Sequence, residues 1–209
     1  MLVVGTANFG QSYGVKNNKQ LDRDEINKIL GYASMARLTH LDSASQYGKS
    51  ESIISDFTQY KFNVITKLAS ENFLDLQQAI NKLNSSIDNL KPHIIESILL
   101  HDVENLFSEN ADLIYKNLCK LKSLGLTKHI GISVYSPEQL LKIIENYDFD
   151  VAQIPINVMD RRLLKSETIK KIKNNSIKIH ARSIFLQGLL LMSHDDLPQN
   201  FNKWKEIFF

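Results

Sequence analysis

Short apolar segments alternate with segments of helical periodicity along the whole chain, and this alternation restricts the fold more than any other feature. The apolar segments, which we interpret as strands, are residues 1–4, 38–42, 62–67, 96–101, 128–133, 150–154 and 177–182. Helical patterns follow them at residues 21–38, 50–60, 73–90, 110–124, 137 onward and 166–174. Strands that alternate with helices at this spacing predict a parallel sheet.

Residues at the ends of these segments support the same interpretation. Asp22 and Glu25 have the spacing of a capping box at the start of the first long helix. Ser136 followed by Pro137 is typical of an N-cap and the first helical position. Gly125 is typical of the residue that follows a helix C-terminus. These signals predict where the helices begin or end.

Two architectures fit such a sheet, a TIM (β/α)8-type barrel and a doubly wound open sheet. A dinucleotide-binding open sheet carries a glycine fingerprint at its first strand–helix turn. The segment GTANFGQSYG, residues 5–14, does not have that spacing and does not run straight into a helix. We therefore expect residues 1–209 to form a single barrel domain, incomplete because it has seven β units where a barrel has about eight.

A missing β unit would leave the first and last strands without a mutual neighbour. Open apolar edges invite pairing with another chain. We therefore expect either a homodimer or a tail folded across the open seam. The apolar tail residues are Phe201, Trp204, Ile207, Phe208 and Phe209.

The composition excludes several classes of partner. The chain is 43% hydrophobic and 23% charged with a net charge of +2, the balance of an ordinary soluble protein. This balance gives no electrostatic reason to expect nucleic acid or membrane as a partner, and no apolar stretch is long enough to span a membrane. The sequence shows no signal-peptide pattern, and its one cysteine, Cys119, cannot form an internal disulfide. We expect a cytoplasmic protein with Cys119 buried in a helix.

Polar residues stand at the ends of three consecutive predicted strands. Asp42, Lys67 and His101 end these strands, and Tyr47 follows Asp42 in the loop before a helix. In a parallel barrel the C-terminal strand ends surround one pocket. The sequence therefore predicts that these four side chains lie together.

Such a set suits the delivery of a proton to an oxygen that gains charge during reduction. A free tyrosine, with a pKa of about 10, is a poor acid at neutral pH. We expect the Lys67 ammonium to lower the pKa of Tyr47, Asp42 to keep Lys67 charged, and His101 to orient a substrate oxygen. None of these groups supplies electrons, so reduction requires a bound hydride donor.

The motif LDSASQYGKSE, residues 41–51, resembles the D-T-A-x-x-Y-G-x-S-E motif of the aldo-keto reductase family, NAD(P)H-dependent reductases on the (β/α)8 barrel. The segments ITK, LLHD, GISVYSPEQL and VAQIPIN follow in the family's order, and the resemblance covers nearly the whole chain. It implies a reductase that converts a small aldehyde or ketone to an alcohol.

The resemblance also implies a role for each matching residue. Tyr47 would be the general acid, Lys67 its pKa partner, Asp42 the partner of Lys67, and His101 the residue that orients substrate. The cofactor would be NADP(H), with NAD(H) as the other candidate. The residues implied to bind it are Gly5 and Thr6 at the first strand end, Ser133 and Gln153 at the nicotinamide amide, Arg182, and a loop containing Ser183, Leu186 and Gly188 at the pyrophosphate.

The chain departs from the family pattern in several places. Val134 stands where many members have asparagine, and Arg182 stands where many have an aromatic residue that stacks on the nicotinamide. Arginine also stacks on planar rings, so Arg182 stays among the cofactor candidates. The family's eighth strand and its basic adenosine-phosphate segment would lie beyond Phe209.

Two other classes of function compete with a reductase. One is a truncated, catalytically impaired homologue that acts as a small-molecule or protein-binding module. The other is a metal-dependent barrel hydrolase built on His40, Asp42, His101 and His180, although the first strand lacks an H-x-H pair. The sequence does not identify the substrate. Arginines 161, 162 and 182 could receive an anionic group, and surface ion pairing is the alternative for the first two.

Overall fold

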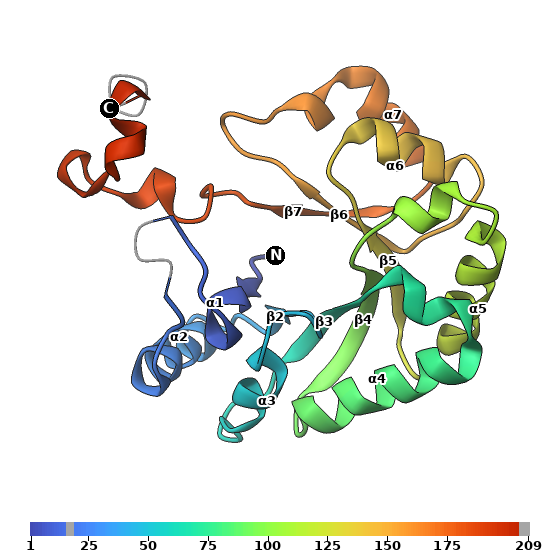
Figure 1. Ribbon diagram of the computed structural model, residues 1–209, viewed down its shortest axis with the longest axis horizontal. Helices are drawn as coiled ribbons and strands as arrows, with labels where there is room; N and C mark the ends of the chain where they lie inside the picture. The colour runs from blue at the N-terminus through green and yellow to red at the C-terminus, as the bar shows by residue number, and fades with distance from the viewer. Residues whose placement is uncertain (16–18, 205–209) are drawn as a thin grey trace.

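Parallel strands lie side by side in chain order and form one curled sheet (Figure 1). The computed structural model describes residues 1–15 and 19–204, and in them the sheet has seven strands: β1 (Val4–Gly5), β2 (His40–Asp42), β3 (Asn63–Leu68), β4 (Ile94–Leu100), β5 (His129–Ser133), β6 (Val151–Pro155) and β7 (Lys178–Arg182). A doubly wound sheet reverses its strand order at a switch point, whereas this order runs from β1 to β7 without reversal. The predicted incomplete TIM-type barrel is therefore confirmed.

Helices lie on the outer side of the curled sheet (Figure 1). They are α1 (Ala7–Gly10), α2 (Arg23–Met35), α3 (Ser50–Ser55), α4 (Leu76–Leu90), α5 (Ala111–Ser123), α6 (Pro137–Ile144) and α7 (Ser166–Asn174). Short 3₁₀ helices are found at Ser70–Leu74, Glu104–Phe107, Arg162–Leu164, Leu189–Leu191, His194–Asp196 and Gln199–Trp204. No helix in the described part of the chain is long and apolar enough to cross a membrane.

The predicted helix ends are confirmed. Asp22 accepts a hydrogen bond from the Glu25 N–H at 2.8 Å, and Glu25 accepts one from the Asp22 N–H at 3.0 Å. Ser136 caps α6, whose first residue is Pro137, and Gly125 has a φ of 72° just after α5. The first strand differs from expectation, because β1 covers only Val4–Gly5, and Met1 and Leu2 are exposed. The loop expected after it contains the short helix α1.

Alternate residues of each strand face two different cores. Val64, Ile98 and Ala152 belong to the large core between sheet and helices, against which Cys119 of α5 also packs, partly buried. A small cluster on the opposite, inner face of the sheet contains Ile65, Leu99 and Val151, with Val3 against it. Because side chains alternate along a strand, the residue two positions beyond each inner residue shares the inner face. This rule places Lys67 and Gln153 on the inner face.

Strands β1 and β7 are the two edges of the sheet, and no pairing joins them in the described residues. The two sides approach at the C-terminal end of the strands, where the Val15 N–H donates to the Gln187 carbonyl at 3.1 Å. Val15 also packs against a small apolar cluster of the C-terminal segment, formed by Leu186, Leu189, Met192, Leu197 and Phe201. The Trp204 side chain and residues 207–209 of the predicted apolar tail lie outside the described residues. The homodimer remains a prediction.

Two glycines hold the Tyr47 loop against α1. A Cβ atom on Gly10 would lie 1.9 Å from the Tyr47 carbonyl oxygen and 2.2 Å from the Ser50 nitrogen. A Cβ atom on Gly48, whose φ is 55°, would lie 2.3 Å from the Gly10 carbonyl oxygen. Backbone atoms cannot move aside as a flexible side chain can, so this contact requires glycine on both sides.

We therefore expect Gly10→Ala to lower the free energy of unfolding by at least about 2 kcal/mol, because the added methyl group meets backbone atoms. Urea unfolding followed by circular dichroism measures the change. Gly5→Ala is the matched control, since a Cβ atom on Gly5 has no atom within 4 Å. Equal stability of the two variants would contradict the close contact.

Candidate active site

Lys67 is a buried ammonium group on the inner face of β3. Its side chain is 1% exposed. Its Nζ donates hydrogen bonds to both carboxylate oxygens of Asp42 and to the carbonyl oxygen of Ser43, each at 2.8 Å. Every N–H of the ammonium therefore has an acceptor. The predicted pairing of Lys67 with Asp42 is present in the structure.

Asp42, at the end of β2, is held from two further sides. The Gln153 side-chain amide of β6 donates to Asp42 Oδ1 at 2.8 Å, so this bond crosses the inside of the curled sheet. The Thr6 hydroxyl donates to the Asp42 backbone carbonyl at 3.0 Å. The carboxylate is thereby fixed beside Lys67.

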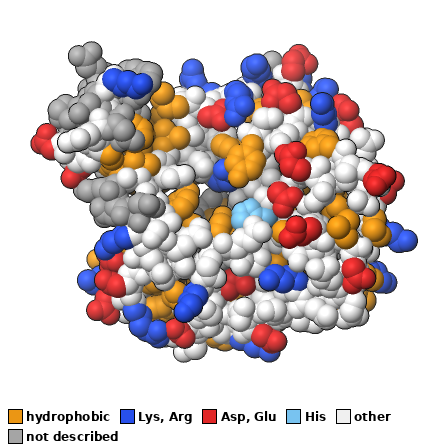
Figure 2. Space-filling model, viewed as in Figure 1, with side chains coloured by type: hydrophobic (Ala, Val, Ile, Leu, Met, Phe, Trp, Pro, Cys, Tyr) orange, Lys and Arg blue, Asp and Glu red, His pale blue; other side chains and the backbone are white. Residues whose placement is uncertain are grey.

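Tyr47 lies between Lys67 and His101. The Lys67 Nζ is 5.1 Å from the centroid of the Tyr47 ring, over its face. The rings of Tyr47 and His101 meet edge to face, with centroids 5.6 Å apart and an interplanar angle of 84°. The four residues predicted to lie together at the strand ends are thus brought together. Figure 2 shows a hollow near the centre of the viewed face of the molecule, bordered by a histidine and hydrophobic side chains.

Burial raises the pKa of the Tyr47 hydroxyl, the Asp42 carboxylate raises it further, and the Arg182 guanidinium lowers it. The expectation that Lys67 lowers this pKa is not met. Burial and the nearby Asp42 carboxylate, with which Lys67 is paired, raise the pKa of Tyr47 instead. The Tyr47 hydroxyl therefore stays protonated at neutral pH.

His101 follows β4, and its Nδ1 is buried with no hydrogen-bond partner in the described part of the protein. Burial lowers the pKa of His101, Lys67 lowers it further, and Asp102 and Asp42 raise it. The ring is therefore neutral at pH 7. Asp102 is held by the Ser70 hydroxyl and by the Ser70 N–H, the latter at 3.2 Å. An unpaired ring nitrogen next to Tyr47 suits a group that contacts substrate.

The residues implied to hold the nicotinamide lie side by side. Ser133 and Gln153 are Cα partners in the β5–β6 register, and both are buried. Gly5 is exposed at the end of β1. Thr6 is fully buried, and its hydroxyl also accepts a hydrogen bond from the Ser50 hydroxyl at 2.8 Å, so internal contacts occupy it.

The segment after β7 has an unusual backbone. Ser183, Leu186 and Gln187 have positive φ values of 57°, 48° and 57°, and Gly188 has a φ of 92°. The left-handed region costs a residue with a side chain roughly 1–2 kcal/mol. Such local strain is common at binding sites.

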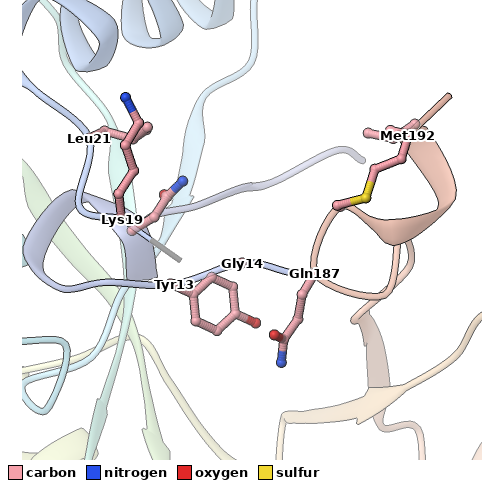
Figure 3. A pocket seen from close by; sticks show the side chains of 9 residues that line it. Tyr13, Gly14, Lys19, Leu21, Gln187 and Met192 are labelled. Carbon is pink, nitrogen blue, oxygen red and sulfur yellow. The ribbon is translucent and has the colours of Figure 1, made fainter. Parts of the chain in front are cut away.

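A cavity of about 280 Å³ lies between this segment and the loop that follows α1. Its lining includes Tyr13, Gly14, Lys19, Gln187 and Gly188. In Figure 3, Tyr13 and Gln187 lie on one side of the cavity, with Lys19 and Met192 at other points of its wall. The cavity offers backbone groups to a ligand, and the Lys19 ammonium at its wall is paired with Glu25 at 3.1 Å.

Three residues near the site were not identified from the sequence. Tyr13 and Tyr135 are close enough for electrostatic interaction with Tyr47, and Asp102 with His101. Tyr135 and Asp102 each follow a strand end closely, so the rule that identified His101 could have found them. Tyr13 carries no such signal, because its loop is not at a strand end and is placed near the site by tertiary contacts, such as the hydrogen bond from Val15 to Gln187.

The residues required by the hydrolase alternative do not meet at a metal site. His40 Nε2 lies 2.7 Å from Glu96 Oε2 in an ion pair or hydrogen bond. His180 has both ring nitrogens buried without a partner in the described structure. The described residues contain no group of three or more side chains that could hold a metal ion.

Solved structures share this fold. A Pseudomonas aeruginosa protein described as an aldo-keto reductase has a TM-score of 0.69 and 22% identity, over 93% of this chain and 74% of that chain. An aldo-keto reductase from Bacillus halodurans has a TM-score of 0.72 and 17% identity, over 90% of this chain and 63% of the other. A Bombyx mori aldo-keto reductase in complex with NADP has a TM-score of 0.64 and 21% identity, over 87% and 62%.

A search of the curated proteins found no match. The model of the aldo/keto reductase family, by contrast, matches residues 1–207. This match spans nearly the whole chain and includes every residue of the cluster around Lys67. The chain therefore belongs to the aldo/keto reductase family.

Proposed function

We propose that this protein is an NAD(P)H-dependent reductase of an aldehyde or ketone, with Tyr47 as the proton donor. Membership of the family supports an oxidoreductase that acts on carbonyl groups. The observation that carries the finer proposal is the packing of the paired Lys67–Asp42 group against the face of Tyr47, with His101 at its edge. We infer NADP(H) as the cofactor, with NAD(H) as the other candidate.

The residues of the chain fit a nicotinamide nucleotide. Ser133 and Gln153 supply a hydroxyl and an amide oxygen at adjacent strand ends, which suits the carboxamide of nicotinamide. The segment from Ser183 to Gly188, together with Gly5, offers backbone groups, and it borders the cavity that contains Lys19. When bound, the nicotinamide supplies the hydride that the protein lacks.

Tyr47 suits the role of general acid because its hydroxyl stays protonated. A carbonyl oxygen gains negative charge as it is reduced, and a positioned acid contributes about 10²–10⁴-fold to such a step. The ring nitrogens of neutral His101 include one donor, which can hydrogen-bond the same carbonyl oxygen and orient it. Together the two groups define the place of the reacting oxygen.

In this proposal the main role of Lys67 is to position the Tyr47 ring. Its ammonium is held by Asp42 and Ser43 and lies over one face of the Tyr47 ring, so it helps to hold that ring in position. As the phenol gives up its proton, the ammonium stabilises the negative charge that develops. Asp42 and Gln153 keep the ammonium in place.

The competing proposal is a binding module without catalysis. Titration of NADPH with the purified chain, followed by NADPH fluorescence, together with an aldehyde-reduction assay, separates the two. The reductase requires both binding and turnover. Binding of NADPH without turnover of any aldehyde would favour the module.

We expect Tyr47→Phe to lower kcat/KM for aldehyde reduction by about 10²–10⁴-fold, because the variant loses the proton donor. The Kd for NADPH should stay within about twofold, since the phenol acts on the substrate oxygen. Steady-state kinetics and fluorescence titration measure the two effects. Tyr32→Phe, at an exposed position of α2, is the matched control. Unchanged turnover in Tyr47→Phe would reject the assignment.

We also expect kcat/KM to show no alkaline decline between about pH 7 and pH 9.5. The ordinary pKa of tyrosine is about 10, and burial and Asp42 raise the pKa of Tyr47 further, so the acid keeps its proton across this range. Rates measured at constant ionic strength test the profile. A decline of kcat/KM with an apparent pKa of about 8 would contradict this prediction and show that the pKa of Tyr47 is lowered.

A further inference from the structure

Arg182 ends β7 and reaches toward the candidate active site. Its Cα is the register partner of Pro155, two positions beyond the pair formed by Gln153 and His180. Because side chains alternate along strands, Arg182 belongs to the same inner face as Gln153. It is the last strand residue on this side before the backbone enters the left-handed segment.

Neutral groups hold the Arg182 guanidinium. Its central carbon lies 4.4 Å from the centroid of the Tyr135 ring. Nη2 donates to the Val134 carbonyl at 3.2 Å, and Nη1 donates to the Ser183 hydroxyl at 3.4 Å. These contacts fix the plane of the group without balancing its charge.

Several cations in the described part of the protein are paired with carboxylates, and Arg182 is not among them. Arg23 and Arg162 pair with carboxylates at 2.6 Å and 2.8 Å, and Lys67 pairs with Asp42. Within the described residues, no carboxylate forms an ion pair with Arg182. The Arg182 charge also acts electrostatically on the candidate active site, because it lowers the pKa values of Tyr47 and His101.

One buried N–H of this group has no acceptor in the described part of the chain. The Nε of Arg182 is buried and has no hydrogen-bond partner among the described residues. This N–H lies in the guanidinium plane, so a ring stacked on the face of the group cannot accept from it. An acceptor in the plane can, and a carboxylate matches the planar fork of an arginine best.

We propose that Arg182 is the receptor for a carboxylate group of the substrate, and that the substrate is an aldehyde or ketone that carries a carboxylate. The proposal rests on the carbonyl reduction proposed above and narrows it to an anionic substrate. The carboxylate would bind in the plane of the guanidinium while the carbonyl oxygen meets Tyr47 and His101. Arg182 is then a residue that determines specificity.

The first test measures binding without turnover. Isothermal titration calorimetry of the full chain with succinate, in the presence and absence of NADPH, reports the carboxylate site directly. We expect Arg182→Met to weaken succinate binding at least about tenfold, as expected for the loss of a charge-assisted hydrogen bond. Arg161→Met removes the same charge from an exposed residue and should leave succinate binding unchanged. Absence of binding to the unchanged chain would overturn the proposal.

The second test compares two substrates of matched length, 4-oxobutanoate and its uncharged methyl ester. The ratio of their kcat/KM values should favour the anion by about 10-fold or more in the unchanged chain. It should approach one in Arg182→Met, whatever the effect on overall turnover. An equal ratio in both proteins would overturn the proposal, because Arg182 would then act on the cofactor or on stability alone.

Arg182→Lys provides a variant that keeps the charge and most of the stem. We expect it to bind succinate with intermediate affinity, because an ammonium lacks the planar fork. Failure of the proposed function has its own signature, since the unchanged chain would then reduce neither compound. The calorimetric comparison still decides the role of Arg182 in that case.

Discussion

The buried Lys67 ammonium is the constraint on which the rest of the candidate site depends. A cation that is 1% exposed is stable only when its N–H groups have acceptors and its charge is balanced. Asp42 and the Ser43 carbonyl meet both requirements, and Gln153 ties the carboxylate to the far side of the sheet. Loss of one partner of such a pair costs about 3–5 kcal/mol. The ends of β2, β3 and β6 are therefore joined by a single polar network.

The open edge of the sheet shapes the other half of the site. In the described residues, a backbone hydrogen bond from the Val15 N–H to the Gln187 carbonyl joins the two sides at the mouth, in place of a strand ladder between β1 and β7. This bond and the apolar cluster around Leu189 hold the segment that carries positive φ values. The cavity that suits a nucleotide lies at the same junction. The proposed cofactor site and the joining of the two edges thus depend on the same few contacts.

The sequence predicts the elements of the fold and the main cluster of the site well, for a physical reason. In a parallel barrel all C-terminal strand ends converge, so Asp42, Lys67 and His101 could be placed together from strand ends alone. The bond from Gln153 to Asp42 spans 111 positions and depends on how far the sheet curls. The stacking of Arg182 on Tyr135 depends on side-chain rotamers. The direction of the Tyr47 pKa depends on burial, which no local pattern of residues encodes.

The two cations at the site therefore act differently. Lys67 lies over the Tyr47 ring and is paired with Asp42, and the pKa of the Tyr47 hydroxyl is raised by burial and by Asp42. In the described residues the groups that hold Arg182 are neutral, and its charge lowers the pKa values of Tyr47, Tyr13 and His101. A partly buried charge without a counter-ion is costly, and an anionic ligand reduces that cost. The Arg182 guanidinium, which has no carboxylate partner among the described residues, is thus the group that an anion bound beside the proposed proton donor would stabilise most.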